Sequence, residues 1–167
     1  MDHTLLNTDI FDLFDEQWGL LTAGTLEDNN AMTISWGQLG SLWGNPGHAK
    51  NVVTVFVKPI RYTFKFMEKY DYFTISWFDK QYRKDLALLG SKSGRDGDKI
   101  ALTKLTRKAI GESVTYNEAN LVMLCRKIYC EQLKKDRIPE NIISSYYTNE
   151  EPHYMYIGEI IRMESSR

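Results

Sequence analysis

The sequence predicts a mainly β fold with inserted helices, arranged as a compact antiparallel barrel. Apolar and polar residues alternate in "NAMTISWG" (30–37), and β-branched residues fill "NVVTVFVK" (51–58); both patterns are typical of strands. At least six segments of this kind occur, with short helical patterns between them. The 167 residues contain no internal repeat and no linker, so we expect residues 1–167 to form one domain.

The first part of the chain is expected to form antiparallel strands joined by turns. "QWGLLTAG" (17–24) is an apolar run that ends at a glycine, and the Asp- and Asn-rich "TLEDNN" joins it to the strand 30–36. The next segment, "GQLGSLWGNPGHAKN" (37–51), is rich in glycine, and we expect an irregular loop there. Pro59 ends the strand 51–58, because proline cannot donate to a strand ladder.

Helices and strands are expected to alternate in the rest of the chain. Apolar residues recur at helical spacing in 60–70, and a second helix is expected between an N-cap at Asp79 and a stop at Gly90. The polar, glycine-rich "SKSGRDGDK" (91–99) is expected to be a loop. Further strands are expected at 72–78, 120–133 and 153–163, with a short helix at 140–147.

Composition and motifs exclude several classes of function. The net charge of -1 gives no basis for binding nucleic acid or an anionic membrane. No segment has the roughly 20 apolar residues that span a bilayer, and the N-terminus lacks a signal-peptide pattern, so a cytoplasmic protein is expected. His3, His48 and His153 are too scattered to suggest a metal site, and no Rossmann, P-loop or serine-hydrolase motif occurs. Cys125 and Cys130 are expected to be reduced thiols within one strand.

"KPIRYT" (58–63) has the features of an anion site at a helix start. The first turn of a helix exposes unpaired backbone N–H groups and a partial positive charge. Arg61 adds a planar set of donors and Thr63 adds a hydroxyl, which together suit a phosphate group. The alternative is an ordinary helix start with a solvated arginine and a capping threonine, which is the more common case.

Two further segments carry weaker signals for a ligand. Thr33 and Ser35 form a hydroxyl face on the strand 30–36, against which a flat ligand could lie, although a solvent-facing strand looks the same. The loop 91–99 could surround a phosphate or a sugar with Ser93, Arg95 and Lys99, or it could be a solvated loop. The residues alone leave both alternatives open in each case.

In chain order, these segments resemble the flavin reductase-like family of FMN-binding split barrels, in particular its flavoredoxin-type proteins. The resemblance lies in "LLTAG…NAMTISWGQLGSLWGNP", "VKPIRYTFKFMEKYDYFTIS", "LGSKSGRDGDK" and "HYMYIGEI", and it covers nearly the whole chain from about Trp18. It implies a six-stranded antiparallel Greek-key split barrel that binds FMN. It also implies a homodimer with one FMN per subunit near the interface, and NADH or NADPH as the electron donor.

The resemblance also implies which residues bind the cofactor. The segment 32–36 is implied to lie along the isoalloxazine ring, 61–63 to hold the phosphate, and 93–99 to close over the ribityl and phosphate side. The implied cofactor-binding residues are Asn30, Met32, Thr33, Ile34, Ser35, Trp36, Arg61, Tyr62, Thr63, Ser93, Arg95, Asp98 and Lys99. The hydroxyl face of Thr33 and Ser35 is therefore expected to meet a flavin.

Two residues near these segments have open roles. His153 precedes the last strand, where many relatives carry a histidine, and it lies either near the nicotinamide side of the flavin or bonded to a neighbouring loop. It is the one candidate catalytic residue. No general base is assigned, because hydride transfer does not require one. Trp43 is expected to pack in the core or at the dimer interface.

Three functions follow from the resemblance and the residues. The first is an NAD(P)H-dependent FMN oxidoreductase that passes electrons to free flavin, iron or another acceptor. The second is an electron carrier of the flavoredoxin type, which a partner protein reduces. The third is a barrel without catalytic activity that binds another ligand or a protein.

Overall fold

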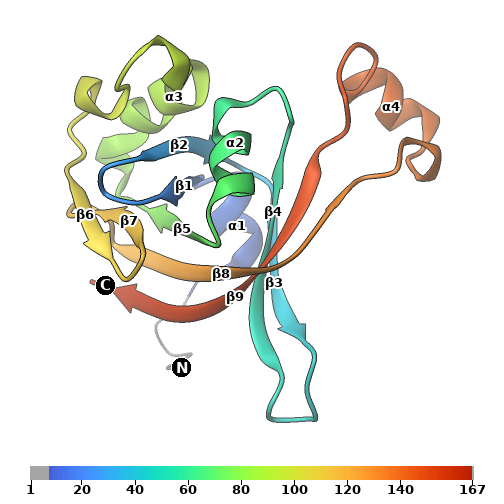
Figure 1. Cartoon of the computed structure of the whole chain (residues 1–167), viewed down its shortest axis with the longest axis horizontal. Coiled ribbons are helices and arrows are strands. Elements are labelled where there is room, and N and C mark those ends of the chain that lie inside the picture. The colour runs from blue at the N-terminus through green and yellow to red at the C-terminus, as the bar shows by residue number, and fades with distance from the viewer. Residues whose placement is uncertain (1–7, 167) are drawn as a thin grey trace.

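The computed structural model describes residues 8–166, and every structural statement below refers to that range. In chain order the elements are α1 (Ile10–Asp15), β1 (Gly19–Gly24), β2 (Asn29–Ile34), β3 (Gly37–Leu42), β4 (Lys50–Val57), α2 (Tyr62–Lys69), β5 (Tyr72–Trp77), η2 (Lys80–Tyr82), α3 (Arg83–Ser91), η3 (Gly94–Asp96), η4 (Ile100–Leu102), β6 (Arg107–Ile110), β7 (Ser113–Tyr116), β8 (Leu121–Gln132), η5 (Lys135–Arg137), α4 (Glu140–Tyr146) and β9 (Tyr154–Ser165). The fold is mainly β with inserted helices, as predicted (Figure 1).

The main sheet has seven strands in the order β2-β1-β5-β8-β9-β4-β3, and all its pairs are antiparallel. Its two edge strands, β2 and β3, are separated in the chain by only Ser35 and Trp36. Three peptide steps span at most about 11 Å, so the two edges of the sheet come together there and the sheet curls around its core. The resemblance implied a six-stranded barrel, whereas the main sheet has seven strands and β6 and β7 form a separate two-stranded sheet.

The core lies inside this curled sheet. Val53, Val55 and Ile75 are fully buried there. Trp77 is also fully buried, and its Nε1 donates to the backbone oxygen of Leu13 at 2.9 Å, which ties α1 to β5. A second cluster of buried apolar residues lies beneath α3. The two clusters place α2 and α3 beside β2, where the candidate site is found.

Three elements were not predicted. The segment 37–51 was expected to be a loop, but Gly37–Leu42 forms β3, which pairs with β4 along its whole length. Its glycines and mostly unburied residues give no alternating pattern, so pairing with β4 outweighs the local sequence. The helix α1 begins after the N-cap Asp9, whose carboxylate accepts from Phe11 N at 2.8 Å. The antiparallel hairpin of β6 and β7 was not predicted either.

Some smaller expectations were wrong. Asp79 is the N-cap residue of η2, which runs directly into α3 at Arg83, but its side chain forms no capping bond and accepts from Nδ2 of Asn120 at 2.8 Å. The same helix runs through Gly90 and ends at Ser91. Trp43 is 58 % exposed at the tip of the β3–β4 hairpin, so it is not a core residue, and its interface role stays a prediction.

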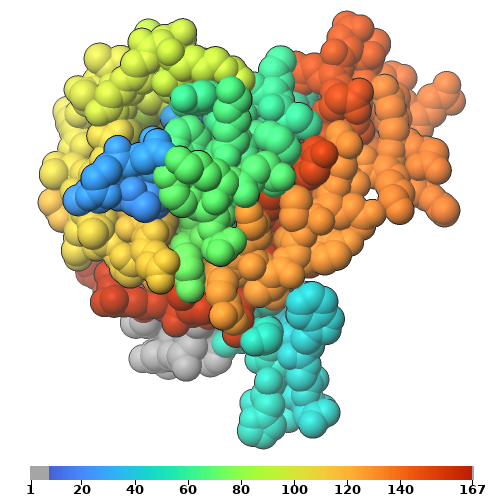
Figure 2. All heavy atoms as spheres, viewed as in Figure 1, coloured from blue at the N-terminus to red at the C-terminus, as the bar shows by residue number. Residues whose placement is uncertain are grey.

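Two segments stand away from the body of the molecule. Figure 2 shows the β3–β4 hairpin and the excursion between β8 and β9, which contains α4, projecting on different sides. Cys125 and Cys130 both lie on β8, as predicted, and both thiols are free. Of the helices in residues 8–166, none combines the length and the apolar character that a membrane-spanning helix needs.

Candidate functional site

A hollow of about 250 Å³ lies where β2, the start of α2, the end of α3 and the η3 loop meet. We call it the anion hollow, because Arg61, Lys92, Arg95 and Lys99 line it and Glu150 is its only carboxylate. Three predicted segments, 30–36, 58–63 and 91–99, converge here. The structure therefore brings together residues that the sequence places up to 69 positions apart.

Lys99 is the most informative of these cations. It is 6 % exposed, and its Nζ donates to the backbone oxygens of Leu89 at 2.7 Å and Lys92 at 2.9 Å. An ammonium group has three donors, and no carboxylate among the described residues pairs with Lys99. Burial and the neighbouring charge of Arg61 lower the pKa of Lys99 to about 8. A buried, unpaired cation of this kind suits an anionic ligand.

Arg61 and the start of α2 form the opposite wall. Arg61 is the N-cap residue of α2, and its exposed side chain lines the anion hollow and a second, neighbouring hollow that is described below. The amides of the first turn, those of Tyr62 and Thr63, have no partner within a helix because of helix geometry. Arg95 lies on the same wall: its Nη2 donates to Ile60 O at 3.1 Å. Positive charge and N–H donors thus face one hollow.

The η3 loop is seated tightly against β2 and α2. A Cβ atom at Gly94 would lie 2.0 Å from Oδ1 of Asn30, so this close approach requires glycine. Nδ2 of Asn30 donates to Oγ1 of Thr63 at 2.7 Å, and both residues are buried. The hydroxyl of Thr63, predicted to face a phosphate, is therefore the acceptor of a buried bond to β2. Ser93 lines the hollow, and its Oγ accepts from Arg95 N at 3.2 Å.

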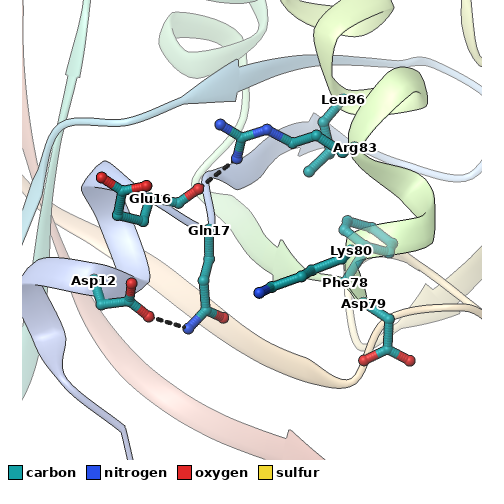
Figure 3. Close-up of a pocket in the computed structure, with 8 residues that line it drawn as sticks. All are labelled: Asp12, Glu16, Gln17, Phe78, Asp79, Lys80, Arg83 and Leu86. Carbon is teal, nitrogen blue, oxygen red and sulfur yellow. Dashed lines mark hydrogen bonds between the residues drawn. The ribbon is translucent and has the colours of Figure 1, made fainter.

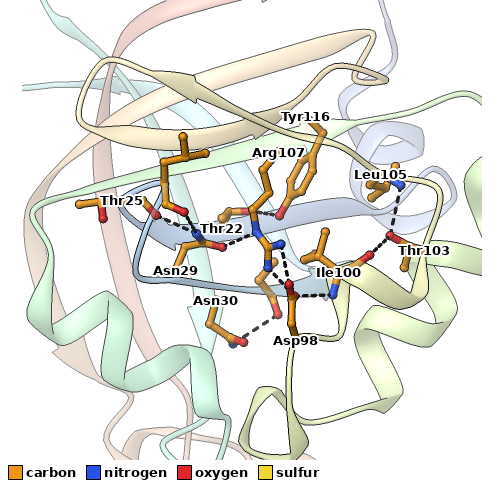
Figure 4. Close-up of polar contacts among 12 residues, drawn as sticks. Thr22, Thr25, Asn29, Asn30, Asp98, Ile100, Thr103, Leu105, Arg107 and Tyr116 are labelled. Carbon is orange, nitrogen blue, oxygen red and sulfur yellow. Dashed lines mark hydrogen bonds and ion pairs between the residues drawn. The ribbon is translucent and has the colours of Figure 1, made fainter.

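Asp98 holds the other end of this loop (Figure 4). Its carboxylate pairs with both terminal nitrogens of Arg107, at 2.6 and 2.9 Å, and accepts from Ile100 N at 3.1 Å. Arg107 also donates from Nε to Oδ1 of Asn29 at 2.9 Å. Through Arg107, the segment that carries Asp98 and Lys99 is therefore linked to β2. The hydrogen bonds from Arg107 hold the pKa of Asp98 below its ordinary value. Asp98 does not line the anion hollow, and its geometry is that of a loop anchor.

A second hollow of about 270 Å³ adjoins the first and shares Met32 and Arg61 with it. We call it the ring hollow, because the residues 32–36 form one side and Trp36, Phe56, Tyr146 and His153 supply aromatic rings. As a sheet edge, β2 pairs only with β1, so the backbone groups along its other side are not used by a strand. Together the two hollows fall within the volumes usual for small-molecule sites.

The hydroxyls of Thr33, on β2, and of Ser35, just after β2, differ in their hydrogen bonds. Oγ1 of Thr33 donates to the backbone oxygen of Leu86 at 2.5 Å, so this hydroxyl holds α3 against β2. Ser35 is half-buried in the ring hollow, and its hydroxyl forms no hydrogen bond with the described residues. Of the two hydroxyls predicted to meet a ligand, the structure leaves that of Ser35 available.

His153 lines the ring hollow and is also bonded to Tyr147 of the neighbouring segment, so its place near a flavin stays a prediction. Its imidazole packs against Trp36, with ring centroids 5.0 Å apart, and its Nδ1 lies 2.8 Å from the phenol oxygen of Tyr147. Burial, followed by the charges of Lys58 and Arg61, lowers the pKa of His153 to about 4. The imidazole is therefore neutral at pH 7. His48 is exposed far from these hollows, and His3 lies outside the described residues.

The sequence patterns missed four residues of the site: Lys58, Tyr146, Tyr147 and Glu150. Three of them come from the excursion between β8 and β9, which folds back so that the ring of Tyr146 lies 5.6 Å from that of Trp36. Glu150 forms an ion pair with Lys58, which lowers the pKa of Glu150. Lys58 stands in the "KPIRYT" segment, but nothing local in the sequence pairs it with a residue 92 positions away.

Three larger hollows lie on the described part of the chain. One, of about 520 Å³, lies between α1 and α3 and is drawn in Figure 3. In it, Nε2 of Gln17 donates to Asp12 at 2.6 Å, and Arg83 donates to the backbone oxygen of Glu16. Another, of about 840 Å³, is a wide apolar groove beside Trp36. The third, of about 360 Å³, borders the anion hollow and shares Lys99 with it. The anion hollow differs from the first of these because four cations gather there around a single carboxylate.

No protein-family model matches the sequence, and no curated protein does. Solved structures do match. An FMN-binding protein from Thermus thermophilus with bound p-hydroxybenzaldehyde has 14 % identity and a TM-score of 0.68, over 89 % of this chain and 71 % of that chain. Flavoredoxin from Methanosarcina acetivorans has 22 % identity and a TM-score of 0.65, over 97 % and 73 %. The styrene monooxygenase flavin reductase from Pseudomonas putida S12 has 14 % identity and a TM-score of 0.62, over 90 % and 80 %.

At these identities the matches establish the fold of the chain. Its structural neighbours are FMN-binding, split-barrel flavin reductase-like proteins and flavoredoxins, so the resemblance in the sequence is confirmed at the level of fold. The seven-stranded antiparallel sheet with few helices is consistent with their split barrel.

Proposed function

We propose that this protein is an FMN-dependent oxidoreductase, with the phosphate of FMN in the anion hollow and the isoalloxazine ring in the ring hollow. One observation carries the proposal: a hollow lined by four cations adjoins a hollow with aromatic walls and a strand edge, and the two share Met32 and Arg61 as lining residues. FMN has the same two parts, an anionic phosphate and a flat ring, joined by a ribityl chain. The FMN-binding proteins among the structural neighbours support the same cofactor.

The residues present fit FMN. Lys99 has an unused donor in a buried position, and Arg61 with the first turn of α2 supplies further charge and N–H groups for a phosphate dianion. Arg95 and Ser93 border the same hollow from the η3 loop. Along the ring, the free backbone edge of β2 and the hydroxyl of Ser35 offer hydrogen bonds to the polar edge of a flavin.

When bound, FMN supplies hydride and single-electron transfer. The chain supplies a hollow whose aromatic walls, Trp36, Tyr146 and His153, would lie beside the ring. N–H groups along the edge of β2 would stabilise negative charge on a reduced flavin bound there, in the manner of an oxyanion hole. Hydride transfer needs no general base, and the neutral His153 agrees with this.

We propose NADH or NADPH as the electron donor, and free flavin, iron or another small molecule as the acceptor. The alternative within the same site is an electron carrier that a partner protein reduces, and flavoredoxin among the structural neighbours favours it. Both functions use the same residues and differ only in the donor. The proposal includes a homodimer with FMN near its interface, which analytical ultracentrifugation with and without FMN can test.

The visible absorption spectrum of the purified protein is the deciding experiment, taken before and after anaerobic addition of NADH and of NADPH. A yellow protein that bleaches with either nucleotide supports the reductase. A yellow protein that bleaches with neither, but does so with dithionite, supports the electron carrier. A colourless protein that also fails to bind added FMN rejects FMN binding and leaves a barrel with another ligand.

A further inference from the structure

The segment after α4 carries a hydrogen-bonded pair that the proposed function does not use. Tyr147 is 3 % exposed, and its phenol oxygen lies 2.8 Å from Nδ1 of His153. The imidazole of His153 forms part of the ring hollow and packs against Trp36. The pair therefore connects a buried phenol to a group that faces the candidate ligand.

The direction of this hydrogen bond follows from the needs of the phenol. A buried O–H group requires an acceptor. The backbone N–H of His153 faces the phenol oxygen as a donor, and it lowers the pKa of Tyr147 against the larger upward effect of burial. Within residues 8–166, Nδ1 of His153 is the only acceptor bonded to this phenol. Tyr147 therefore donates to Nδ1, and a neutral imidazole then carries its proton on Nε2.

The surroundings keep this imidazole neutral. Burial has the largest effect in lowering the pKa of His153, the positive charges of Lys58 and Arg61 add to it, and the negative charge of Glu150 opposes it. Nε2 forms no hydrogen bond with the part of the chain that the structure describes. The N–H group on Nε2 is thus available to whatever occupies the ring hollow.

We propose that Tyr147 is a positioning residue, which holds His153 as the neutral Nε2–H tautomer so that the ring hollow offers a fixed hydrogen-bond donor. A group held in this way is neither a base nor a cation. It suits an occupant with a neutral carbonyl oxygen or a ring nitrogen lone pair at its edge. The tautomer is a property of this chain alone, and only the identification of the occupant as a flavin rests on the proposed function.

Imidazole ¹⁵N NMR of the wild-type protein tests the tautomer directly. Only three histidines contribute signals, and His153→Gln identifies the resonances of His153 by their loss. Between pH 6 and 8, we expect a protonated Nε2 and an unprotonated Nδ1. An Nδ1–H tautomer, or an even mixture of the two, overturns the inference.

Tyr147→Phe and Tyr146→Phe form a matched pair for the second test. Each removes one phenol oxygen from the same segment, but the hydroxyl of Tyr146 forms no hydrogen bond with the described residues, whereas that of Tyr147 meets His153. We expect Tyr147→Phe to convert His153 to a mixture of tautomers and Tyr146→Phe to leave it unchanged. If Tyr147→Phe keeps the wild-type tautomer, Tyr147 does not position the imidazole. If that variant fails to fold, the wild-type spectrum still decides.

Addition of FMN separates this inference from the proposed function. If both hold, FMN shifts the resonances of the Nε2–H group of His153, while Nδ1 stays unprotonated. If FMN does not bind but His153 is the Nε2–H tautomer, the proposed function fails and the positioning role stands. If FMN binds and His153 is the Nδ1–H tautomer, only the positioning role fails.

Discussion

The anion hollow and the ring hollow adjoin at Met32 and Arg61, but they are built in different ways. The anion hollow is enclosed by elements that buried hydrogen bonds hold in place, such as Asn30 to Thr63 and Lys99 to the end of α3. One side of the ring hollow is instead the excursion between β8 and β9, and α4 within it has no buried residue. That side is held by ring contacts, by the hydrogen bond of Tyr147 with His153, and by Lys58, which pairs with Glu150 and donates to the backbone oxygen of Tyr146.

Different interactions therefore keep the two hollows in shape. Buried networks such as that of Lys99 are costly to break, so the anion hollow keeps its shape before a ligand arrives. Contacts such as Tyr146 against Trp36, and the pair of Lys58 with Glu150, are partly exposed and individually weak. Substitutions in the first region should therefore abolish binding, whereas substitutions in the second should adjust it.

Lys99→Met should give the largest effect. It removes the buried charge while keeping an unbranched side chain of similar length, and a hydrogen bond to a charged group contributes about 1.5–3 kcal/mol. We expect the affinity for FMN to fall about 10- to 100-fold, measured by quenching of FMN fluorescence. Lys104→Met is the control, since Lys104 is exposed outside both hollows. Equal FMN affinity in the two variants would remove Lys99 from the phosphate site.

Arg61→Ala should reduce FMN affinity about tenfold, because it removes a charged phosphate contact from an exposed position where water can replace part of it. The same titration measures it, with the exposed Arg137→Ala as the control. Unchanged affinity in Arg61→Ala would contradict the assignment of the anion hollow to the phosphate.

The sequence could predict much of the anion hollow, because its residues lie in three short segments with local signals. The glycine-rich loop 91–99 and the helix start 58–63 are both visible without the fold. Local patterns could not show which way each side chain faces. The carboxylate of Asp98 pairs with Arg107 and the hydroxyl of Thr33 bonds to α3, partners that no local pattern indicates, and the place of both residues at the cofactor stays a prediction.

The ring hollow was only half predictable for a different reason. The strand 30–36 could be read from its alternation, but Tyr146 and Glu150 reach the site because a segment outside the barrel folds back over β2. That return depends on contacts between residues far apart in the chain, such as Tyr146 with Trp36. The strand β3 was missed for the same reason, since only its pairing with β4 defines it.

The pH dependence of FMN binding should sharpen the comparison. The ammonium form of Lys99 binds the phosphate, and its pKa of about 8 in the ligand-free protein is below the ordinary lysine value. Because half of the Lys99 amine is deprotonated at pH 8, we expect FMN affinity to fall about twofold from pH 7 to 8 and more steeply above pH 8, by at most about tenfold per unit. Fluorescence titrations from pH 7 to 9.5 measure this, and Lys99→Met should show no such fall. A flat wild-type profile would contradict the role of Lys99.

The stability of the ligand-free protein should change with pH in the opposite sense. Because the pKa of Lys99 is lowered on folding, the unfolded chain binds more protons between pH 8 and about 10.4. The contribution of Lys99 to the free energy of unfolding therefore rises with pH across this window. Urea unfolding at pH 8 and pH 10, compared between the wild type and Lys99→Met, isolates that contribution. If the free energy of unfolding of the wild type minus that of Lys99→Met fell between pH 8 and pH 10, the lowered pKa would be contradicted.

Glu150→Gln should give the smallest effect, and it should be a gain. Glu150 places a negative charge in the anion hollow, where it pairs with Lys58 and opposes an incoming phosphate. The substitution removes that repulsion and frees Lys58, but it also releases the ion pair that holds the excursion. Because both groups border solvent, we expect FMN affinity to rise only about two- to fivefold. The neighbouring, exposed Glu151→Gln keeps the same change in net charge outside the hollow and should leave affinity unchanged. A loss of affinity in Glu150→Gln would mean that the excursion, and not the free cations, limits binding, and that the ring hollow is as firmly built as the anion hollow.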